Sequence, residues 1–590
     1  MQASACCKHY IANELDRSNG TDRYHVDVFV PQQDLVDSYM PSFQTCVEEG
    51  QVSGIMCSYN AVNGVPSCAN DWLLGTVLRQ EWEFDGYVTS DCDADSDVFF
   101  SHHYTNTTDE AVAAIVGAGT DVDCGGFMGK YTQQAINNGA VTEAQLDVLL
   151  RRLFRVRLRL GHFDPVGALG KIGVDQVCND YAIELARDSA RQSVVVVKNT
   201  NNALPLNPAS YSKAVIIGPL IDLTSTIGYY GSKPCFNNNT EPQQAIIDWI
   251  PSATSIKGVP SVSSNDQSGI PAAAAAAQAA DLVVLQIGSD LSLEAEGNDR
   301  TSIDFSDAQK ALVTAVTAAA TAPVIAMIFS GGAMDISSLL SNPKIVGIIV
   351  CGQPSVQVVG AGDVIFGKTH DGRIVSPAGR MSQMTYPADY VNQVSMFEFS
   401  LRPGPSNWPP GTTPGRTYRF YTGTAVVPFG FGLSYTTWQY TPLPDPTPPV
   451  NGMQLVDLTS VRVAATEHEL KGANGVGTIP KSLKSYAANF WLNVTNTGSV
   501  DSDDVVLGFM VPPGAGTNGV PLQELFGFER VFVPAGQTVT VYIGAQGVRF
   551  TQAGIDGVRR VLPGEYTVRF GVKETFEFGM GYTEVKVLAQ

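Results

Sequence analysis

The chain has 590 residues, of which 44% are hydrophobic, so it can bury several cores and is expected to hold two to four domains. Its formal net charge of −20 and its sequence pI of about 4.7 disfavour nucleic acid and anionic membrane surfaces as partners. No apolar run reaches the roughly 20 residues that cross a bilayer, which disfavours a transmembrane protein.

The cysteines and the glycosylation sequons favour a secreted glycoprotein. Ten cysteines are present, and Asn19, Asn106, Asn238 and Asn493 each precede a Thr by two positions. We therefore predict an extracellular location. Met1 nevertheless opens onto QASACC, without the charged region and the long apolar region of a signal peptide. The sequence thus predicts that a segment is missing from the front of this chain.

Residues 1–165 alternate short buried strands with helices. The predicted strands are 3–10, 54–61, 86–91 and 119–124, and the predicted helices are 32–49, 71–83, 109–116 and 142–160. Such alternation is typical of a parallel sheet with right-handed crossovers. Polar residues stand at the strand ends, among them Lys8, His9, Tyr59 and Asp91, as in the active sites of (β/α)8 barrels. Because a barrel needs eight units and only four are present, we interpret this region as the C-terminal half of a barrel.

The middle of the chain has the pattern of a second domain. After a linker and helix at 166–190, strands are predicted at 193–198, 214–219, 281–288, 323–330 and 344–351, with helices at 271–280 and 306–320 between them. This order predicts an α/β sandwich domain over residues 191–440, with helices on both faces of an open sheet.

The C-terminal region is predicted to be a β-sandwich. A Pro-rich linker, TPLPDPTPPVNG, spans residues 441–452 and should be stiff and exposed. Alternating strands follow at 488–496, 504–511, 537–543 and 565–572, with turn residues between them. We assign residues 453–590 to this domain.

Two segments match ligand-binding motifs, one for calcium and one for phosphate, but the residues around them do not support either assignment. The acids of GYVTSDCDAD (86–95) alternate like calcium ligands, but Ser96 and His102 stand where a calcium loop needs Gly and Glu. The segment GDVIFGKT (362–369) matches a phosphate loop but does not follow a strand and open a helix, so we interpret it as a helix end capped by glycine. A second carboxylate centre, LSLEAEGNDR (291–300), follows the predicted strand 281–288 and could equally be a solvated charged loop.

Several long motifs stand in order along the chain: CCKHYIANELD (6–16), MCSYNAVNGVPSCAN (56–70), GYVTSDCDAD (86–95), RRLFRVRLRLGHFDP (151–165), EAEGNDRTSID (294–304), PGRTYRFY (414–421) and PFGFGLSYT (428–436). They resemble motifs of fungal glycoside hydrolases of family 3, and of their β-xylosidase branch in particular. The resemblance runs in order through the chain and implies a barrel, an α/β sandwich and a fibronectin-III-like module. It implies no cofactor and no metal ion.

The resemblance also implies roles for individual residues. Family members are retaining glycosidases, which implies Asp91 as the nucleophile and Glu296 as the acid/base, with Glu294 as the alternative. Lys8 and His9 match a pair that binds sugar hydroxyls, and Tyr59 matches a tyrosine near the nucleophile. Asp93, Asp95 and Asp97 are then loop or supporting carboxylates.

The cysteines next to the nucleophile bear on the substrate. Cys92 follows Asp91, and Cys124 ends the next predicted strand, so the two are near enough for a disulfide, as in the xylosidase branch. Such a wall would fill the space of a hexose hydroxymethyl group and favour a pentose. Two unpaired buried thiols are the alternative. Cys57 and Cys68 bracket a compact loop and form a second candidate pair.

The sequence therefore predicts an exo-β-1,4-xylosidase that releases xylose from the non-reducing ends of xylo-oligosaccharides. A β-glucosidase or an α-L-arabinofuranosidase is the alternative. The family's first barrel half carries a sugar-binding Asp and Arg, and no segment here supplies them, so a catalytically incompetent truncated form remains the third hypothesis. The oligomeric state is left open.

Overall fold

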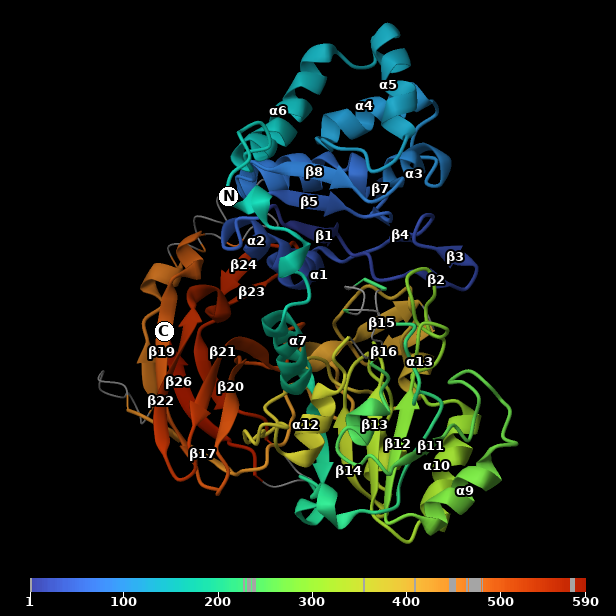
Figure 1. The fold of residues 1–590 in the computed structure, drawn as a ribbon. Coiled ribbons are helices and arrows are strands. Elements are labelled where there is room, and N and C mark those ends of the chain that lie inside the picture. The colour runs from blue at the N-terminus through green and yellow to red at the C-terminus, as the bar shows by residue number, and fades with distance from the viewer. Residues whose placement is uncertain are drawn as a thin grey trace.

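The computed structural model describes residues 3–226, 229–230, 235, 240–353, 356–407, 410–444, 453–462, 465, 479, 481–573 and 579–590. Three bodies are visible in Figure 1. The N-terminal part lies at the top, the middle part at the lower right and the C-terminal sandwich at the lower left, with α7 (Asp180–Ser193) below the N-terminal part and between the other two in this view.

The N-terminal part contains a parallel three-stranded sheet in the order β1-β5-β8. Its strands are β1 (Cys6–Tyr10), β5 (Gly54–Cys57) and β8 (Tyr87–Ser90). Its longer helices are α2 (Met40–Glu48), the π-helix Trp72–Glu81, α3 (Ala94–Phe100), α4 (Thr108–Ala118), α5 (Phe127–Asn137) and α6 (Glu143–Arg159). The capping boxes of α4 and α6, at Thr107 and Thr142, explain where these two helices begin. All three strands end at the same edge of the sheet, and β5 and β8 are paired there at Cys57 and Ser90.

The predicted strand at 119–124 is the main difference from expectation in this part. It makes only one isolated bridge, between Thr89 and Val122. The Asp121 side chain accepts the Val88 amide at 2.7 Å and is also paired with Arg79. The Asp121 carboxylate therefore takes the Val88 amide, which a longer strand at 119–124 would use for backbone pairing.

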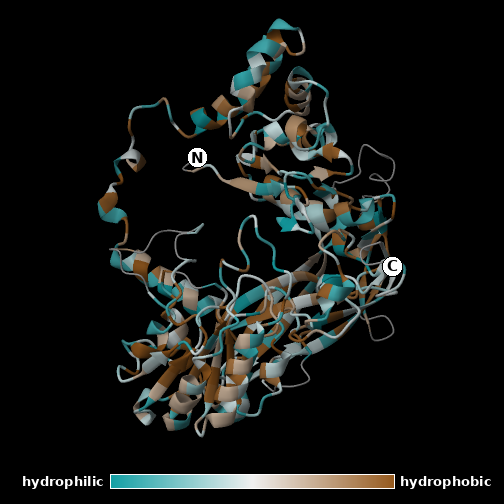
Figure 2. Ribbon diagram, turned by 90° about the vertical axis from the view of Figure 1, so that its right-hand side faces the viewer, coloured by the Kyte–Doolittle hydropathy of each residue, from teal (hydrophilic) through white to brown (hydrophobic). Residues whose placement is uncertain are grey.

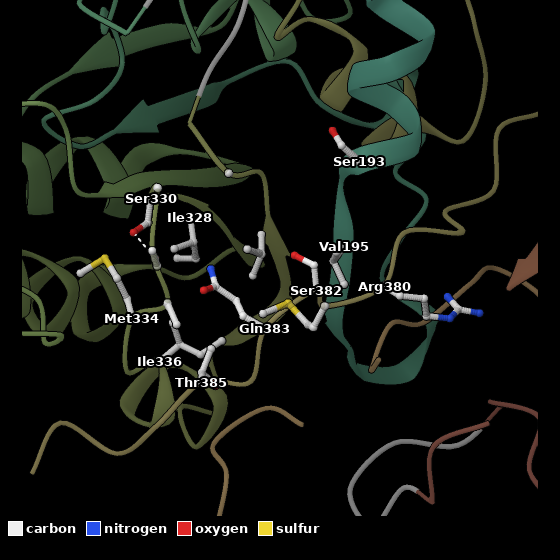
Figure 3. Close-up of a pocket in the computed structure, with 16 residues that line it drawn as sticks. Ser193, Val195, Ile328, Ser330, Met334, Ile336, Arg380, Ser382, Gln383 and Thr385 are labelled. Atoms are coloured by element: carbon white, nitrogen blue, oxygen red, sulfur yellow. Dashed lines mark hydrogen bonds between the residues drawn. The ribbon is translucent and has the colours of Figure 1, made fainter. Parts of the chain in front are cut away.

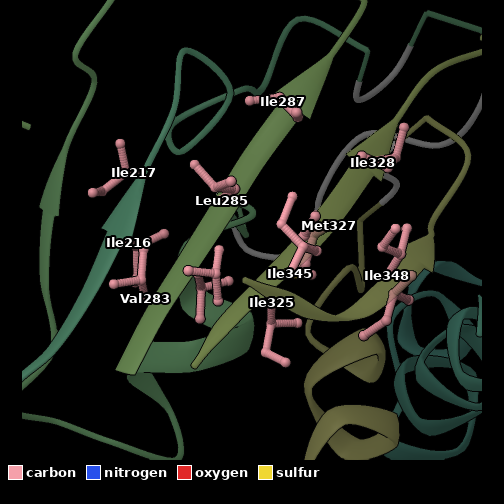
Figure 4. Packing of buried hydrophobic residues seen from close by; sticks show 14 of the residues in the cluster. Ile216, Ile217, Val283, Leu285, Ile287, Ile325, Met327, Ile328, Ile345 and Ile348 are labelled. Atoms are coloured by element: carbon pink, nitrogen blue, oxygen red, sulfur yellow. The ribbon is translucent and has the colours of Figure 1, made fainter. Parts of the chain in front are cut away.

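The middle part is a six-stranded mixed sheet in the order β11-β10-β12-β13-β14-β9. Its strands are β9 (Val195–Asn199), β10 (Ala214–Ile217), β11 (Thr254–Ile256), β12 (Leu282–Gly288), β13 (Val324–Phe329) and β14 (Ile345–Val350). The edge strand β9 runs antiparallel to β14, and all other pairs are parallel. Figure 4 shows the branched apolar side chains of the central strands packed together, and Figure 2 shows hydrophobic residues concentrated in these strands. The helices α9 (Ile270–Ala279) and α10 (Asp307–Ala319) correspond to the predicted helices 271–280 and 306–320, and they pack against each other.

The segment 362–369 is a helix end, as its context predicts. Helix α12 (Gly360–Phe366) stops at Gly367, which has a φ of 69° and caps it in the left-handed conformation. Asp363 of this helix is fully buried and paired with Arg187 and Arg191 of α7. Asp363 thus links α12 to α7.

The C-terminal part is a two-sheet β-sandwich with orders β17-β19-β22 and β18-β26-β25-β20-β21. The strands are β17 (Trp438–Pro442), β18 (Gln454–Val456), β19 (Tyr486–Asn496), β20 (Ser502–Val511), β21 (Glu524–Val533), β22 (Thr538–Gln546), β25 (Gly564–Phe570) and β26 (Thr583–Ala589). Residues 445–452 of the predicted linker lie outside the described residues. The strands β17, β18, β21 and β26 were not predicted; β17 completes the first sheet, and the other three complete the second.

A buried ionic cluster joins the three parts. Asp37 lies in the π-helix Leu35–Tyr39, within the predicted helix 32–49, and it accepts hydrogen bonds from Arg402, Arg419 and Arg559 at 2.7, 2.8 and 3.1 Å. Asp34 also pairs with Arg402. The arginines follow Asp37 by 365, 382 and 522 positions. No local pattern in the sequence could indicate this contact.

Candidate active site

Asp91 stands directly after β8, at the edge where the strands of the N-terminal sheet end. Its amide donates to the Cys57 carbonyl at 3.1 Å, and the Cys92 amide donates to Asp91 Oδ1 at 2.8 Å. His9 Nε2 lies 3.4 Å from Asp91 Oδ2. The carboxylate is 13% exposed, so a small molecule can reach it while the surrounding strand ends hold it in place.

His9 of β1 and Tyr59, which follows β5, flank this carboxylate. Burial lowers the pKa of the His9 imidazole, and the Asp91 carboxylate only partly offsets this effect. The imidazole is therefore neutral at neutral pH. Burial raises the pKa of Tyr59, and the Asp91 carboxylate raises it further, so the phenol stays protonated and can donate to Asp91. The sequence-predicted residues His9, Tyr59 and Asp91 are thus brought together.

Lys8 lies beside this group but points to another element. Its side chain is exposed, and its Nζ lies 5.0 Å from the ring centroid of Tyr230, in the loop before α8 (Gln244–Ile247). Lys8 therefore contributes a positive charge at the boundary between the N-terminal and middle parts.

Both predicted cysteine pairs are disulfides in the structure, Cys92 with Cys124 and Cys57 with Cys68. The first lies directly beside Asp91. The Cys124 amide donates to the Ser90 hydroxyl at 2.8 Å, and the Asp93 amide donates to the Cys124 carbonyl at 2.7 Å. The disulfide and these bonds fasten the loop after the nucleophile candidate. Two further disulfides, Cys7–Cys46 and Cys178–Cys235, were not predicted.

The other acids of the 91–97 segment have different environments. Asp95 is buried, and burial together with the nearby Asp123 raises its pKa well above the usual range. Asp97 accepts the Ser101 hydroxyl at 2.5 Å, and burial raises its pKa to about 6. Asp93 is exposed. Within the described part of the chain, no group of three or more His, Cys, Asp or Glu side chains could hold a metal ion.

Glu294 is anchored within its own domain. Its carboxylate accepts the Gly331 and Gly332 amides at 2.6 and 3.2 Å, and Arg300 Nε lies 2.9 Å away. The Ser289 hydroxyl, at the end of β12, also donates to it. These contacts satisfy both oxygens and hold the 291–300 loop to the ends of β12 and β13.

Glu296 faces the N-terminal part instead. Its Oε1 lies 2.8 Å from Arg23 Nη1, and its Oε2 accepts the Tyr230 hydroxyl. Its amide donates to the Tyr229 hydroxyl at 2.6 Å. The hydrogen bond from Tyr230 and the contact with Arg23 hold the pKa of Glu296 below its usual range.

Arg23 links the two carboxylate centres and was missed by the sequence analysis. Its guanidinium lies 4.5 Å from the Tyr59 ring centroid, and Tyr59 is adjacent to Asp91. The loop is held from a second point, because Asp299 accepts the amides of Asp16 and Arg17, both at 2.8 Å. The pairings of Arg23 and Asp299 join residues more than 270 positions apart, which no spacing rule could have found.

A separate pocket of about 170 Å³ lies behind the anchor of Glu294 (Figure 3). It is lined by the ends of β13 and β14 and by the segment around Gln383, and Gly331 and Gly332 belong both to its wall and to the Glu294 contacts. Its described lining includes no carboxyl group, so it offers no acid–base pair.

Comparison with known proteins identifies the class to which this fold and this carboxylate arrangement belong. The family descriptions "Glycosyl hydrolase family 3 N terminal domain" and "Glycosyl hydrolase family 3 C-terminal domain" match residues 2–156 and 194–435, and "Fibronectin type III-like domain" matches residues 504–573. The chain belongs to glycoside hydrolase family 3, and it is a glycosidase with an α/β architecture and a fibronectin-III-like C-terminal domain.

Similar proteins include several xylosidases. "Beta-D-xylosidase 1" of Arabidopsis thaliana is 38% identical over 581 residues, which cover 97% of this chain and 72% of that protein. "Probable exo-1,4-beta-xylosidase bxlB" of Aspergillus fumigatus is 35% identical and covered to 70%. The solved structure of a "GH3 exo-beta-xylosidase (XlnD) in complex with xylobiose aziridine activity based probe" has a TM-score of 0.86 at 28% identity, covering 99% of this chain and 72% of that one. The chain therefore spans about 70% of the length of these relatives.

In the described part of the chain, no helix combines the length and the apolar character needed to span a membrane.

Proposed function

We propose that this protein is a retaining exo-β-1,4-xylosidase, secreted, with Asp91 as nucleophile and Glu296 as acid/base. The observation that carries the proposal is the placement of Glu296 across Arg23 and Tyr59 from Asp91, while Glu294 is bound within its own domain. The names of the similar proteins support xylose as the sugar released.

The proposed reaction has two steps. Asp91 attacks the anomeric carbon and forms a glycosyl ester while Glu296 gives its proton to the leaving glycosidic oxygen. Glu296, now a carboxylate, then takes a proton from water, whose oxygen attacks the anomeric carbon and releases Asp91. Retention results from the two displacements.

The neighbours of Asp91 suit the first step. Neutral His9 lies beside the attacking carboxylate, and the protonated phenol of Tyr59 can donate a hydrogen bond to it, so neither side chain neutralises its charge. His9 and the exposed Lys8 ammonium are proposed to bind hydroxyl groups of the sugar. The Cys92–Cys124 disulfide lies where it would limit the room beside that sugar, which favours a pentose over a hexose.

A second activity, towards α-L-arabinofuranosides, has a specific basis. "Beta-xylosidase/alpha-L-arabinofuranosidase 2" of Medicago sativa subsp. varia is 36% identical over 541 residues, covering 90% of this chain and 66% of that protein. Arabinofuranose is also a pentose, but its five-membered ring carries a hydroxymethyl group on C4, so the support for this activity is the similar protein and not the disulfide. The solved β-glucosidase structures are 21% to 24% identical and support the fold alone.

The proposal is tested with aryl β-xyloside, α-L-arabinofuranoside and β-glucoside on the purified chain. We expect hydrolysis of the xyloside, with little or none of the glucoside, and release of β-xylose as the first product seen by NMR. A 2-fluoroxyloside should label the peptide that contains Asp91. Labelling of Asp93 or Asp95, or release of α-xylose, would refute the assignment.

A further inference from the structure

Both oxygens of the Glu296 carboxylate have partners within the protein. Arg23 approaches Oε1 from the N-terminal part, and Tyr230 donates to Oε2 from a loop of the middle part. A third contact, from the Glu296 amide to Tyr229, fixes the backbone. A residue proposed to donate a proton is thus held by side chains that favour its ionised form.

Arg23 is itself held in position by several neighbours. It follows the short strand β3 (Thr21–Asp22), and its side chain is 10% exposed. Nη2 donates to the Tyr24 hydroxyl at 3.0 Å, and Nη1 lies 3.3 Å from Asp16 Oδ1. The guanidinium also lies over the rings of Tyr24 and Tyr59. These contacts fix the position of the side chain, with Nη1 directed at the Glu296 carboxylate.

The geometry points to a role that the proposed reaction leaves open. We propose that Arg23 is a positioning residue that, together with Tyr230, clamps Glu296 over the nucleophile side and keeps it ionised until substrate enters. This inference rests on the proposed function, because it concerns Glu296 as the acid/base. It assigns the control of acid catalysis to a residue of the opposite part of the molecule.

The clamp should set the alkaline limit of activity. The charged and titratable groups near the Glu296 carboxylate are Tyr230, Arg23, Lys8 and His9. The Tyr230 hydrogen bond, the Arg23 contact and the Lys8 charge all stabilise the carboxylate. Protonated Glu296 is then abundant only at acidic pH, and kcat/KM should fall as pH rises through its pKa. Removing the Arg23 charge should therefore extend activity to higher pH.

The kinetic test compares Arg23→Gln, Arg23→Lys and Tyr24→Phe with the wild-type chain. We expect Arg23→Gln to move the alkaline limb of kcat/KM to higher pH, and Arg23→Lys, which keeps the charge, to leave it near the wild-type position. Tyr24→Phe is the matched control, since it removes a neutral partner of Arg23 and leaves the contact with Glu296. An unmoved limb in Arg23→Gln would overturn the proposal.

If Arg23 had only a structural role, its replacement would reduce the activity on all substrates by the same factor. We expect Arg23→Gln to lose about tenfold more activity on an alkyl xyloside, whose leaving oxygen needs a proton, than on a dinitrophenyl xyloside, whose leaving oxygen does not. Equal losses on the two substrates would contradict positioning of the acid.

A double-mutant cycle on the free energy of unfolding can distinguish an error in this inference from an error in the proposed function. Arg23→Gln, Glu296→Gln and the double variant are unfolded in urea near neutral pH, where Glu296 is ionised. We expect the two single effects to be non-additive. Additive effects would overturn the clamp. Non-additive effects in a chain that hydrolyses no xyloside would support the clamp and refute the proposed function.

Discussion

Replacement of Asp37 by Asn should weaken the junction of the three parts more than any surface change. Asp37 is 7% exposed and contacts three guanidinium groups between 2.7 and 3.1 Å. The isosteric amide removes the charge that faces all three guanidinium groups, and it leaves Asp34 beside Arg402 and Glu524 at 3.8 Å from Arg419. Removing one partner of a buried ion pair typically costs about 3–5 kcal/mol. We therefore expect the free energy of unfolding to fall by about 3 kcal/mol or more.

The assay is urea unfolding followed by tryptophan fluorescence, since Trp72 and Trp82 report on the N-terminal part. Asp503→Asn is the matched control. Asp503 pairs with Arg530 at 2.6 Å, but both side chains are about one-third exposed. A pair of this kind contributes about 1 kcal/mol or less. If Asp37→Asn destabilises the protein no more than Asp503→Asn does, the reasoning about the buried cluster is wrong.

The pH dependence gives a second check on the same residue. Burial alone would raise the pKa of Asp37, but Arg419, Arg559 and Arg402 more than offset it, and the net pKa lies below the usual range. A depressed pKa contributes stability above the unfolded-state pKa of about 4, and this contribution is lost as pH falls through the folded-state pKa. The difference between wild type and Asp37→Asn should therefore be full at neutral pH and shrink in strong acid. If the difference in the free energy of unfolding grows below pH 4, the pKa of Asp37 is not lowered and this reasoning is wrong.

Three other predictions follow from the site and the surface. Azide should partly restore turnover of a dinitrophenyl xyloside by Glu296→Ala and give a β-linked azide product, because the intermediate then lacks its base; rescue of Glu294→Ala instead would exchange the two roles. Opening the Cys92–Cys124 disulfide, as Cys92→Ser with Cys124→Ser, should lower the ratio of xyloside to glucoside kcat/KM; an unchanged ratio would show that this wall does not select the sugar. Leu158 and Phe163 are 62% and 56% exposed, so Leu158→Ser with Phe163→Ser should reduce self-association in light scattering, and equal scattering would show that this apolar surface is not the cause.

The sequence by itself determined the local elements and the place of the nucleophile candidate. Short buried runs predicted β1, β5 and β8, and runs rich in β-branched residues predicted the central strands of the middle sheet, since such patterns depend on neighbours a few positions apart. The same locality identified the helix end at Gly367 and placed Asp91 directly after a buried strand. The long motifs predicted the family, which the comparisons confirmed.

Only the tertiary structure decided how the two carboxylate centres relate to each other. Glu294 and Glu296 are two positions apart in one loop, and their sequence context cannot tell which faces its own sheet and which faces Arg23. The partners of Glu296 and the partners of Asp37 come from segments 66 to 522 positions away. Such contacts form when elements from distant parts of the sequence pack together, and a charged group that becomes buried there needs a partner. The spacing of residues in the sequence does not indicate which groups will meet, so Arg23 and Tyr230 could be identified only from the tertiary structure.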